Sequence, residues 1–434
     1  MKHKLLWVSD SPNLITGYAT VTKNILNRLN NYPKWDCTAL ASTPSGAVGE
    51  PIKRIELMDG TNLNFKILSA YREPYAMDIV TKYIKNYNFN VLGILLDTFM
   101  LYPKFLQVDI PCKSFFYFPS DGGGHLPLRC EEILKKVTIP IAMSKFGQKQ
   151  LKDIYGMRAE YIPHGCNTSL YYPISDKEKV KSRVPCYMFN GQNFVKTDNI
   201  LQNKFIIGSV FRNQPRKQPD RLYKAFAKFA KDKPDVMLYL HLDPLDVASP
   251  IDTLSLMGRL NILHKVVFTG MTYITGFSTK MLNDIYNSMD CFFLSTTGEG
   301  FGLPTLEAMS CGVPPIITDY ATTSELLQEN GECGLPINII GTEEISTFEL
   351  MKERGYNSQQ IDEFRSNGTI VGSWNVDRAI MDIDSAVKQL DKLYYDKKLR
   401  ESLGKTGREK AVKYYDWEVL IPVWNKLLLN LAEE

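Results

Sequence analysis

The stretch STTGEGFGLPTLEAMSCGVPPIITD, residues 295–319, contains a loop, a helix and a strand that follow one another closely. It continues the apolar run CFFLST (291–296), which predicts a strand whose exit loop is TGEGFG. The segment LPTLEAMSC predicts a helix, which Gly312 ends before a second strand, PPIIT. A helix between two buried strands is typical of α/β proteins with parallel sheets.

Two glutamates in this segment indicate that it binds a ligand. Glu299 lies among the glycines of the loop, and Glu307 lies in the predicted helix. Glycines allow close approach of a ligand, and a helix N-terminus attracts phosphate. Since a carboxylate repels phosphate, we expect Glu299 to contact the hydroxyls of a sugar and Glu307 those of a ribose. The pattern therefore predicts a nucleotide-sugar site.

The same alternation extends over the chain of 434 residues, which is long enough for two domains. Helices are predicted at 18–29 and 219–231. Apolar runs predict strands at 5–9, 91–97, 114–119 and 137–144 in the first half, and at 204–211, 236–242, 265–270 and 291–296 in the second. We expect two doubly wound parallel-sheet domains, residues 1–195 and 196–415, and a helix over 416–434 that crosses back to the first domain.

In such sheets, ligands bind beyond the carboxyl ends of the strands. We therefore expect five loops to converge on one cleft: 10–17, 119–125, 212–218, 270–276 and 296–303.

The spacing Glu, seven residues, Glu in GEGFGLPTLEAMSCGVPPI resembles the signature of the retaining GT-B glycosyltransferases of family four, the glycosyl transferases group 1. Three further blocks resemble that family in the same order: IPHGCNTSLYYP (162–173), GSVFRNQPRKQPDRLYKAFAKF (208–229) and YYDWEVL (414–420). The resemblance is close over 204–335 and 405–420 and loose over the first half. It implies a GT-B fold, with two Rossmann-like domains facing across a cleft.

The resemblance also implies roles for residues of the second half. Arg212 and Lys217 would clamp the diphosphate and take part in catalysis with Glu299. Arg216 is an additional cation, and Gln218 replaces a glycine often found after this lysine, which puts the loop geometry in doubt. The other residues that would bind the donor are Thr269, Gly270, Met271, Gly300, Phe301, Gly302, Leu303 and Glu307.

In the first half, Gly17 matches the glycine of the first loop, which approaches the donor phosphate or the acceptor. A histidine is expected near the fourth strand, but the chain reads YFPSDGGGHLPLR there. Asp121 and His125 are the candidates for catalytic contact with the sugar or acceptor. A hydrogen bond within its loop explains His125 equally well.

The activity that the resemblance implies is transfer of a hexose with retention of configuration and without a metal or other cofactor. A UDP-sugar is the favoured donor and a GDP-sugar the second choice. Asp382 and Asp384 fall in a predicted helix rather than after a strand, which argues against a metal-dependent GT-A enzyme. Two alternatives stay open: a catalytically silent nucleotide-sugar-binding protein, and a phosphorylase-like enzyme, for which no lysine segment suited to a pyridoxal cofactor is evident.

Charge gives the main indication of the acceptor. Residues 1–200 contain 25 Lys and Arg against 17 Asp and Glu, whereas the remainder contains 26 against 31. This asymmetry favours an anionic acceptor, such as a membrane lipid or a nucleic acid with hydroxylated bases, although scattered solvated lysines explain it as well. No dense basic helix with interleaved aromatic residues points to nucleic acid specifically.

The remaining features concern location and an insertion. The eight cysteines show no CxxC spacing and most lie in apolar segments, which favours reduced thiols. The N-terminal segment has too short an apolar run for a secretion signal. We expect a cytoplasmic protein, with peripheral membrane attachment left open. Residues 341–368 are predicted to be an inserted polar helical segment.

Overall fold

The computed structural model describes residues 2–41, 52–56, 62–70, 74–101, 104–124, 126, 130–246, 249–270, 276–353, 356–366 and 375–434. The chain divides into two compact units. Unit 1 consists of Met1–Gly165, Ser358–Val376 and Trp417–Glu434, and unit 2 of Cys166–Asn357 and Asp377–Asp416. Unit 2 begins at Cys166, whereas the sequence predicts that the second domain begins at residue 196. The domain limits given from the sequence stay a prediction.

The sheet of unit 1 has the strand order β3-β4-β2-β1-β5-β6-β8-β9, so the chain reverses its direction of travel across the sheet between β1 and β5. The pairings are parallel except for the antiparallel pair of β3 and β4. The strands are β1 (His3–Ser9), β2 (Trp35–Ala41), β3 (Ile52–Glu56), β4 (Asn62–Ser69), β5 (Val91–Ile94), β6 (Lys113–Phe118), β8 (Ile139–Ala142) and β9 (Glu160–Tyr161).

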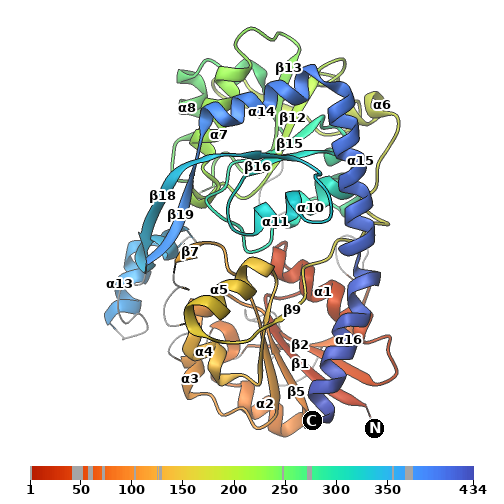
Figure 1. Ribbon diagram of the computed structural model, residues 1–434, viewed down its shortest axis with the longest axis vertical. Helices are drawn as coiled ribbons and strands as arrows, with labels where there is room; N and C mark the ends of the chain where they lie inside the picture. The colour runs from red at the N-terminus through yellow and green to blue at the C-terminus, as the bar shows by residue number, and fades with distance from the viewer. Residues whose placement is uncertain are drawn as a thin grey trace. The chain divides into compact units, whose positions relative to one another are not determined.

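Helices cover both faces of this sheet, with α1 and α16 on one side and α4 and α5 on the other (Figure 1). The side chain of Thr16 caps α1 by accepting a hydrogen bond from the Ala19 amide. In the core, the Trp424 ring of α16 lies 5.8 Å from Trp7 and 4.9 Å from Tyr117. The helices are α1 (Gly17–Leu29), α2 (Val80–Tyr87), α3 (Lys104–Gln107), α4 (Cys130–Lys136), α5 (Lys145–Tyr155), α13 (Ser358–Ser366) and α16 (Trp417–Glu433).

The sheet of unit 2 has the order β11-β10-β14-β13-β12-β15-β16-β17 and reverses between β12 and β15. Its six strands from β14 to β17 are parallel, and β10 and β11 add antiparallel pairs at one edge. The strands are β10 (Tyr187–Phe189), β11 (Phe194–Lys196), β12 (Phe205–Val210), β13 (Val236–His241), β14 (Val266–Phe268), β15 (Cys291–Leu294), β16 (Pro315–Thr318) and β17 (Leu335–Ile337).

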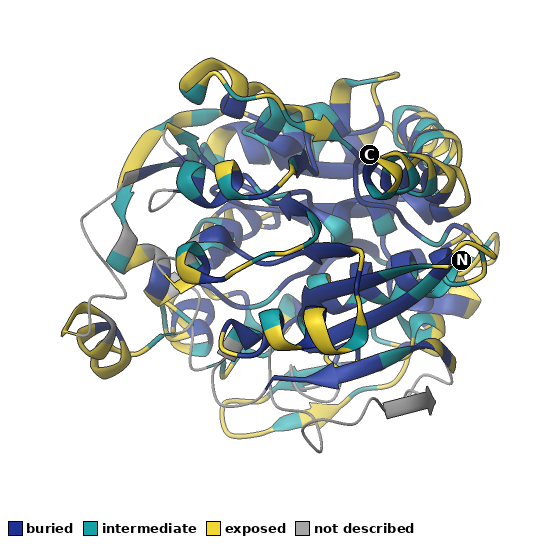
Figure 2. Cartoon of the chain, turned by 90° about the horizontal axis from the view of Figure 1, so that it is seen from below, coloured by how far each residue is buried: buried dark blue, intermediate teal, exposed yellow. Residues whose placement is uncertain are grey.

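Amphipathic helices pack on this second sheet. In α7, Leu222, Phe226 and Phe229 are buried on one face, and Pro219 begins the helix, where its missing N–H costs nothing. Figure 2 shows most strands in the dark blue of buried residues and the outer helix surfaces largely in yellow. The helices are α6 (Lys177–Lys181), α7 (Pro219–Phe229), α8 (Thr253–Arg259), α9 (Thr279–Asn287), α10 (Leu303–Ser310), α11 (Thr322–Gln328), α12 (Thr347–Glu353), α14 (Ile383–Tyr395) and α15 (Lys397–Tyr414).

Two expectations about elements need correction. The segment 341–368, predicted to be helical, starts within strand β18 (Ile339–Ser346) before α12 and α13 follow. Strand β18 is hydrogen-bonded to β19 (Asn375–Met381), a partner distant in sequence that no local pattern reveals. Asp382, expected within a helix, instead directly follows strand β19 and caps the start of α14, and Asp384 lies in the first turn of that helix.

Candidate functional site

The candidate site of unit 2 lies where the sheet reverses direction, between the loops that follow β12 and β15 (Figure 1). The first loop carries Arg212 and the turn Pro215–Lys217, and the second carries Glu299. These are neighbouring strands, so their carboxyl ends place the two loops side by side.

Glu299 is the centre of this site. Its side chain is almost completely buried, and each carboxylate oxygen faces a different cation. The Oε1 atom contacts the Lys217 ammonium, and the Oε2 atom lies 3.1 Å from Nη1 of Arg216. The structure therefore brings together the predicted residues Lys217 and Glu299. It also gives Arg216 a direct partner in Glu299.

The ionisation of Glu299 follows from these two cations. Burial alone would raise the pKa of its carboxyl group, but the charges of Arg216 and Lys217 outweigh burial and lower that pKa to about 2. The group is therefore ionised at neutral pH. Two cations and one carboxylate leave one net positive charge in the triplet, which suits an anionic ligand.

The backbone of the two loops is cross-linked by hydrogen bonds. The Thr297 amide donates to the Arg216 carbonyl at 2.8 Å, and the Ser295 hydroxyl donates to the Lys217 carbonyl at 2.7 Å. The Arg216 side chain donates in return to the Gly298 carbonyl at 2.6 Å. These bonds fix the basic turn against the loop that holds Glu299.

Arg212 has a separate partner. Its Nε atom donates to Oδ2 of Asp246 at 3.0 Å, from the loop that follows β13. Asp246 is not among the site residues predicted from the sequence. Its position shortly after a predicted strand, in HLDPLD, was the available signal.

The glycine-rich loop ends at the N-terminus of α10. Gly302 has φ 99°, a left-handed conformation that favours glycine, and begins the helix that Leu303 and Pro304 continue. The Gly300 carbonyl accepts a hydrogen bond from the Thr322 hydroxyl at 3.2 Å. The Phe301 side chain is buried, with its ring 6.0 Å from that of Tyr415, so its contribution to a ligand site would come from its backbone.

Glu307 faces tyrosines. The Tyr286 hydroxyl of α9 donates to its Oε2 atom at 2.6 Å, and the Tyr171 hydroxyl also bonds it. Burial raises the pKa of Glu307 to about 7, although both hydroxyls act to lower it. The thiols of Cys166 and Cys311 lie near enough to feel its charge. Neither tyrosine was predicted as a site residue, because nothing in the sequences around them, SLYYP and NDIYN, indicates which side chain their hydroxyls contact.

The residues predicted to lie beside the base are described in part. Thr269 is buried, and its hydroxyl is hydrogen-bonded to Nδ1 of His241 at 3.0 Å. Burial lowers the pKa of His241 to about 4, so its imidazole is neutral. Gly270 has φ 71° and lies against the Tyr187 ring, where a Cβ atom would clash. Met271 lies outside the described residues.

The predicted residues of unit 1 are spread over its first and middle loops. Gly17 is exposed and begins α1, next to Thr16, whose hydroxyl donates to Asp10 at 2.6 Å. Asp121 is buried after β6. His125 lies outside the described residues.

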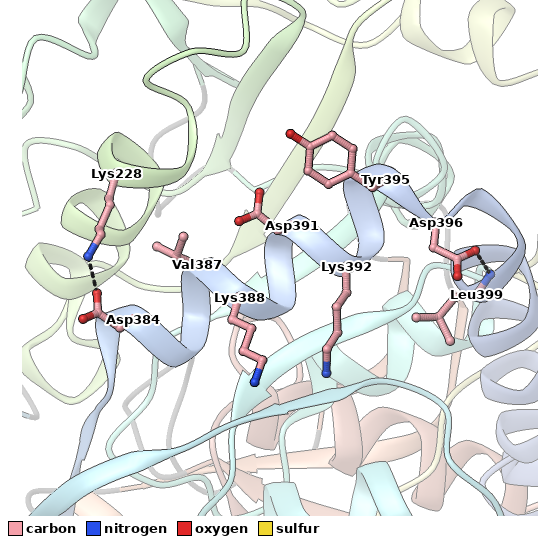
Figure 3. A pocket seen from close by; sticks show the side chains of 9 residues that line it. All are labelled: Lys228, Asp384, Val387, Lys388, Asp391, Lys392, Tyr395, Asp396 and Leu399. Carbon is pink, nitrogen blue, oxygen red and sulfur yellow. Dashed lines mark hydrogen bonds and ion pairs between the residues drawn. The ribbon is translucent and has the colours of Figure 1, made fainter.

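The described ranges contain no group of three or more His, Cys, Asp or Glu side chains suited to holding a metal ion. None of their helices is long and apolar enough to cross a membrane. A shallow depression of about 540 Å³ lies on α14, and none of the predicted site residues lines it (Figure 3). Its rim includes the ion pair of Lys228 and Asp384.

Comparison with known proteins finds a family match over the segment that contains this site. Residues 192–338, which include the basic turn and both glutamates, match the family model of the glycosyl transferases group 1. This segment of the chain is thus similar to that family. The mannosylfructose-phosphate synthase of Agrobacterium fabrum is 24% identical over 196 residues, which are 43% of this chain and 38% of that protein. The chain thus spans less than half the length of this curated relative.

Solved structures of glycosyltransferases share the fold over nearly the whole chain. Sucrose-phosphate synthase from Thermosynechococcus elongatus has a TM-score of 0.70 at 15% identity and covers 99% of both chains. Anabaena HepE, solved with UDP and glucose, has a TM-score of 0.68 at 13% identity and covers 99% of this chain and 100% of its own. The chain therefore has the α/β GT-B fold, with two Rossmann-like domains.

Proposed function

We propose that the protein is a retaining, metal-independent glycosyltransferase that moves a hexose from a nucleotide-diphosphate sugar to a hydroxyl group of an unidentified acceptor. The observation that carries this proposal is the buried triplet of Glu299, Lys217 and Arg216 at the point where the sheet of unit 2 reverses. A UDP-sugar is favoured over a GDP-sugar, which is consistent with the UDP bound to Anabaena HepE.

In this proposal the donor lies along the loops of unit 2. Lys217 and Arg216, together with Arg212, meet the diphosphate, and they neutralise the charge that builds on it as the bond to the sugar breaks. Glu299 accepts hydrogen bonds from sugar hydroxyls. Its ionised state supports that role, because a carboxylate can only accept.

Further residues are proposed to contact the donor. Glu307 accepts hydrogen bonds from the ribose, and the backbone of Gly300, Phe301, Gly302 and Leu303 approaches the sugar and phosphate. Thr269, Gly270 and Met271 lie beside the base. Gly17 approaches the donor phosphate or the acceptor.

The acceptor hydroxyl attacks on the face from which the diphosphate departs, and the departing phosphate takes its proton. Asp121 and His125 are the residues proposed to contact the sugar or acceptor. The excess of Lys and Arg in the first 200 residues supports an anionic acceptor.

The test uses UDP-glucose with water in place of the acceptor, in the presence of EDTA. Slow hydrolysis that first releases α-glucose, followed by proton NMR before the anomers equilibrate, would support retention without a metal. GDP-glucose serves as the comparison donor. Release of β-glucose would contradict retention, and abolition by EDTA would contradict metal independence. Tight binding without any turnover, with every candidate acceptor, would favour a silent nucleotide-sugar-binding protein.

A further inference from the structure

Gln218, the residue directly after Lys217, has a backbone conformation that glycine adopts more easily. Its φ and ψ are 44° and 52°, in the left-handed region. This conformation is sterically unfavourable for a residue with a Cβ atom. Something in the surrounding structure must therefore hold Gln218 in place.

The Gln218 side chain is almost fully buried, and both ends of its amide are bonded to strand β19. Its Nε2 atom donates to the Ala379 carbonyl, and its Oε1 atom accepts from the Met381 amide at 3.1 Å. A glycine at this position could make neither bond. These two contacts are a physical reason for glutamine at a position where members of the resembled family often have glycine.

Strand β19 also binds the second loop of the site. The Ala379 amide donates to the Thr297 carbonyl at 2.9 Å, two residues before Glu299. At its end, the Met381 carbonyl accepts from Nε of Arg221 at 2.7 Å. The same short stretch of β19 thus contacts both loops whose side chains form the Lys217–Glu299 pair.

We propose that Gln218 is a positioning residue, which fastens the basic turn to β19 and so holds Lys217 in the geometry that binds the donor diphosphate. This inference rests on the proposed function of Lys217. Within the turn, the Gln218 amide donates to the Pro215 carbonyl at 2.9 Å, and the Lys217 amide donates to the Gln214 carbonyl at 3.0 Å. The side-chain bonds of Gln218 attach the turn to β19, in addition to the bonds that attach it to the loop of Glu299.

Strand β19, which follows the predicted insertion of residues 341–368, therefore has a role in the donor site. It is hydrogen-bonded to both loops, and Gln218 is the side chain that connects it to the turn that carries Lys217. Without that connection, Lys217 would keep its charge but would be held less firmly in the position that binds the diphosphate. Binding of the diphosphate would therefore weaken.

Two variants remove the connection in different ways. Gln218→Gly removes both side-chain bonds and relieves the left-handed strain, and Gln218→Met keeps the length but loses both bonds. We expect each to raise the Kd for UDP, measured by calorimetry, about tenfold, the order expected from the loss of two buried hydrogen bonds. Asn261→Gly is the matched control, because Asn261 also has a positive φ, 54°, but lies after α8 on the surface. It should leave the Kd unchanged.

A double-mutant cycle with Lys217→Ala separates positioning from general destabilisation. If Gln218 acts through Lys217, Gln218→Gly should weaken UDP binding in the parent and have almost no further effect in Lys217→Ala. An equal effect in both backgrounds, or parent-like binding by both Gln218 variants, would overturn the inference. If Lys217→Ala itself binds UDP as tightly as the parent, the proposed donor site is what fails.

Discussion

At the scale of single residues, the site depends on three side chains whose charges are mutually stabilised. Glu299 remains ionised although buried because Arg216 and Lys217 each face one of its oxygens. A diphosphate that enters would compete with this carboxylate for the same cations. Removal of the carboxylate therefore affects turnover and nucleotide binding in different directions.

Glu299→Gln tests this difference. We expect turnover of the UDP-sugar to fall about 10²- to 10³-fold, because the amide cannot reproduce a charged acceptor at the reacting sugar. The affinity for UDP should be unchanged or tighter, since both cations remain. A coupled UDP-release assay measures turnover, and calorimetry measures the Kd for UDP. Glu332→Gln, at an exposed glutamate of the same unit, is the control; parent-like turnover by Glu299→Gln would contradict its role.

The pH dependence of donor binding tests Glu307. Below about pH 7 its carboxyl group is protonated, and above that pH it is ionised and accepts ribose hydroxyls more strongly. Binding should therefore tighten as pH rises through about 7. Tyr286→Phe removes a bond that lowers this pKa, so the transition should move upward by roughly one to two pH units.

Titrations with UDP-glucose from pH 6 to 9 measure that transition, since its diphosphate does not titrate there. Tyr394→Phe is the matched control, because its hydroxyl also bonds a carboxylate, that of Asp235, at 2.8 Å. A transition that stays at the same pH in Tyr286→Phe, or moves equally in Tyr394→Phe, would contradict the assignment of Glu307.

The charged residues of the candidate site were predictable from the sequence, but their neighbours were not. Glu299 and Lys217 belong to motifs that resemble those of a known family, so roles could be proposed for them from the sequence. Asp246 and Tyr286 act through contacts made by folding, and nothing in their local sequence distinguishes them from ordinary surface or core residues. The bonds from Gln218 to the backbone of β19 span more than 160 positions and involve no partner side chain, so no motif could reveal them.

At the scale of elements, α16 belongs to the core of unit 1 although it follows unit 2 in the chain. Its Trp424 side chain is fully buried against the rings of Trp7, Phe115 and Tyr117. The opposite side of the helix faces solvent, and Val423 there is half-exposed. The helix therefore completes the hydrophobic core on one face of the sheet.

Trp424→Ala should lower the free energy of unfolding of unit 1 by about 3–5 kcal/mol, the usual cost of removing a large buried aromatic side chain. Val423→Ala, its neighbour on the same helix, should change that free energy by about 0.5 kcal/mol or less. Denaturant titration followed by tryptophan fluorescence and circular dichroism measures both. Similar stability for the two variants would show that α16 is not a core element.

Strands that are buried on both faces could be predicted from the sequence. Continuous apolar runs identified β5, β6, β12 and β15 because parallel strands are buried on both faces. The polar strand β18 was wrongly expected to be helical, since its conformation depends on pairing with β19. The short edge strands β10 and β11 lack such a run and were missed for the same reason.

At the scale of the whole molecule, each unit contains a doubly wound sheet of mainly parallel strands, and the charges are distributed unequally along the sequence. If the acceptor is anionic, as proposed, binding to it should weaken as ionic strength rises. Vesicles that contain phosphatidylglycerol and a DNA duplex represent the two candidate classes, and phosphatidylcholine vesicles are the neutral control. We expect several-fold weaker binding to one of the anionic classes between 50 and 200 mM salt. No salt-dependent binding to either would contradict an anionic acceptor.

The central claim is that unit 2 binds a nucleotide diphosphate through Lys217 beside Glu299. The most direct measurement is calorimetric titration of the metal-free protein with UDP, GDP and ADP, with and without EDTA, for the parent and Lys217→Ala. We expect tightest binding of UDP, unaffected by EDTA and weakened about 10- to 100-fold in Lys217→Ala, because a charge-assisted contact is lost. Absence of binding to all three diphosphates, or equal binding by Lys217→Ala, would contradict the claim.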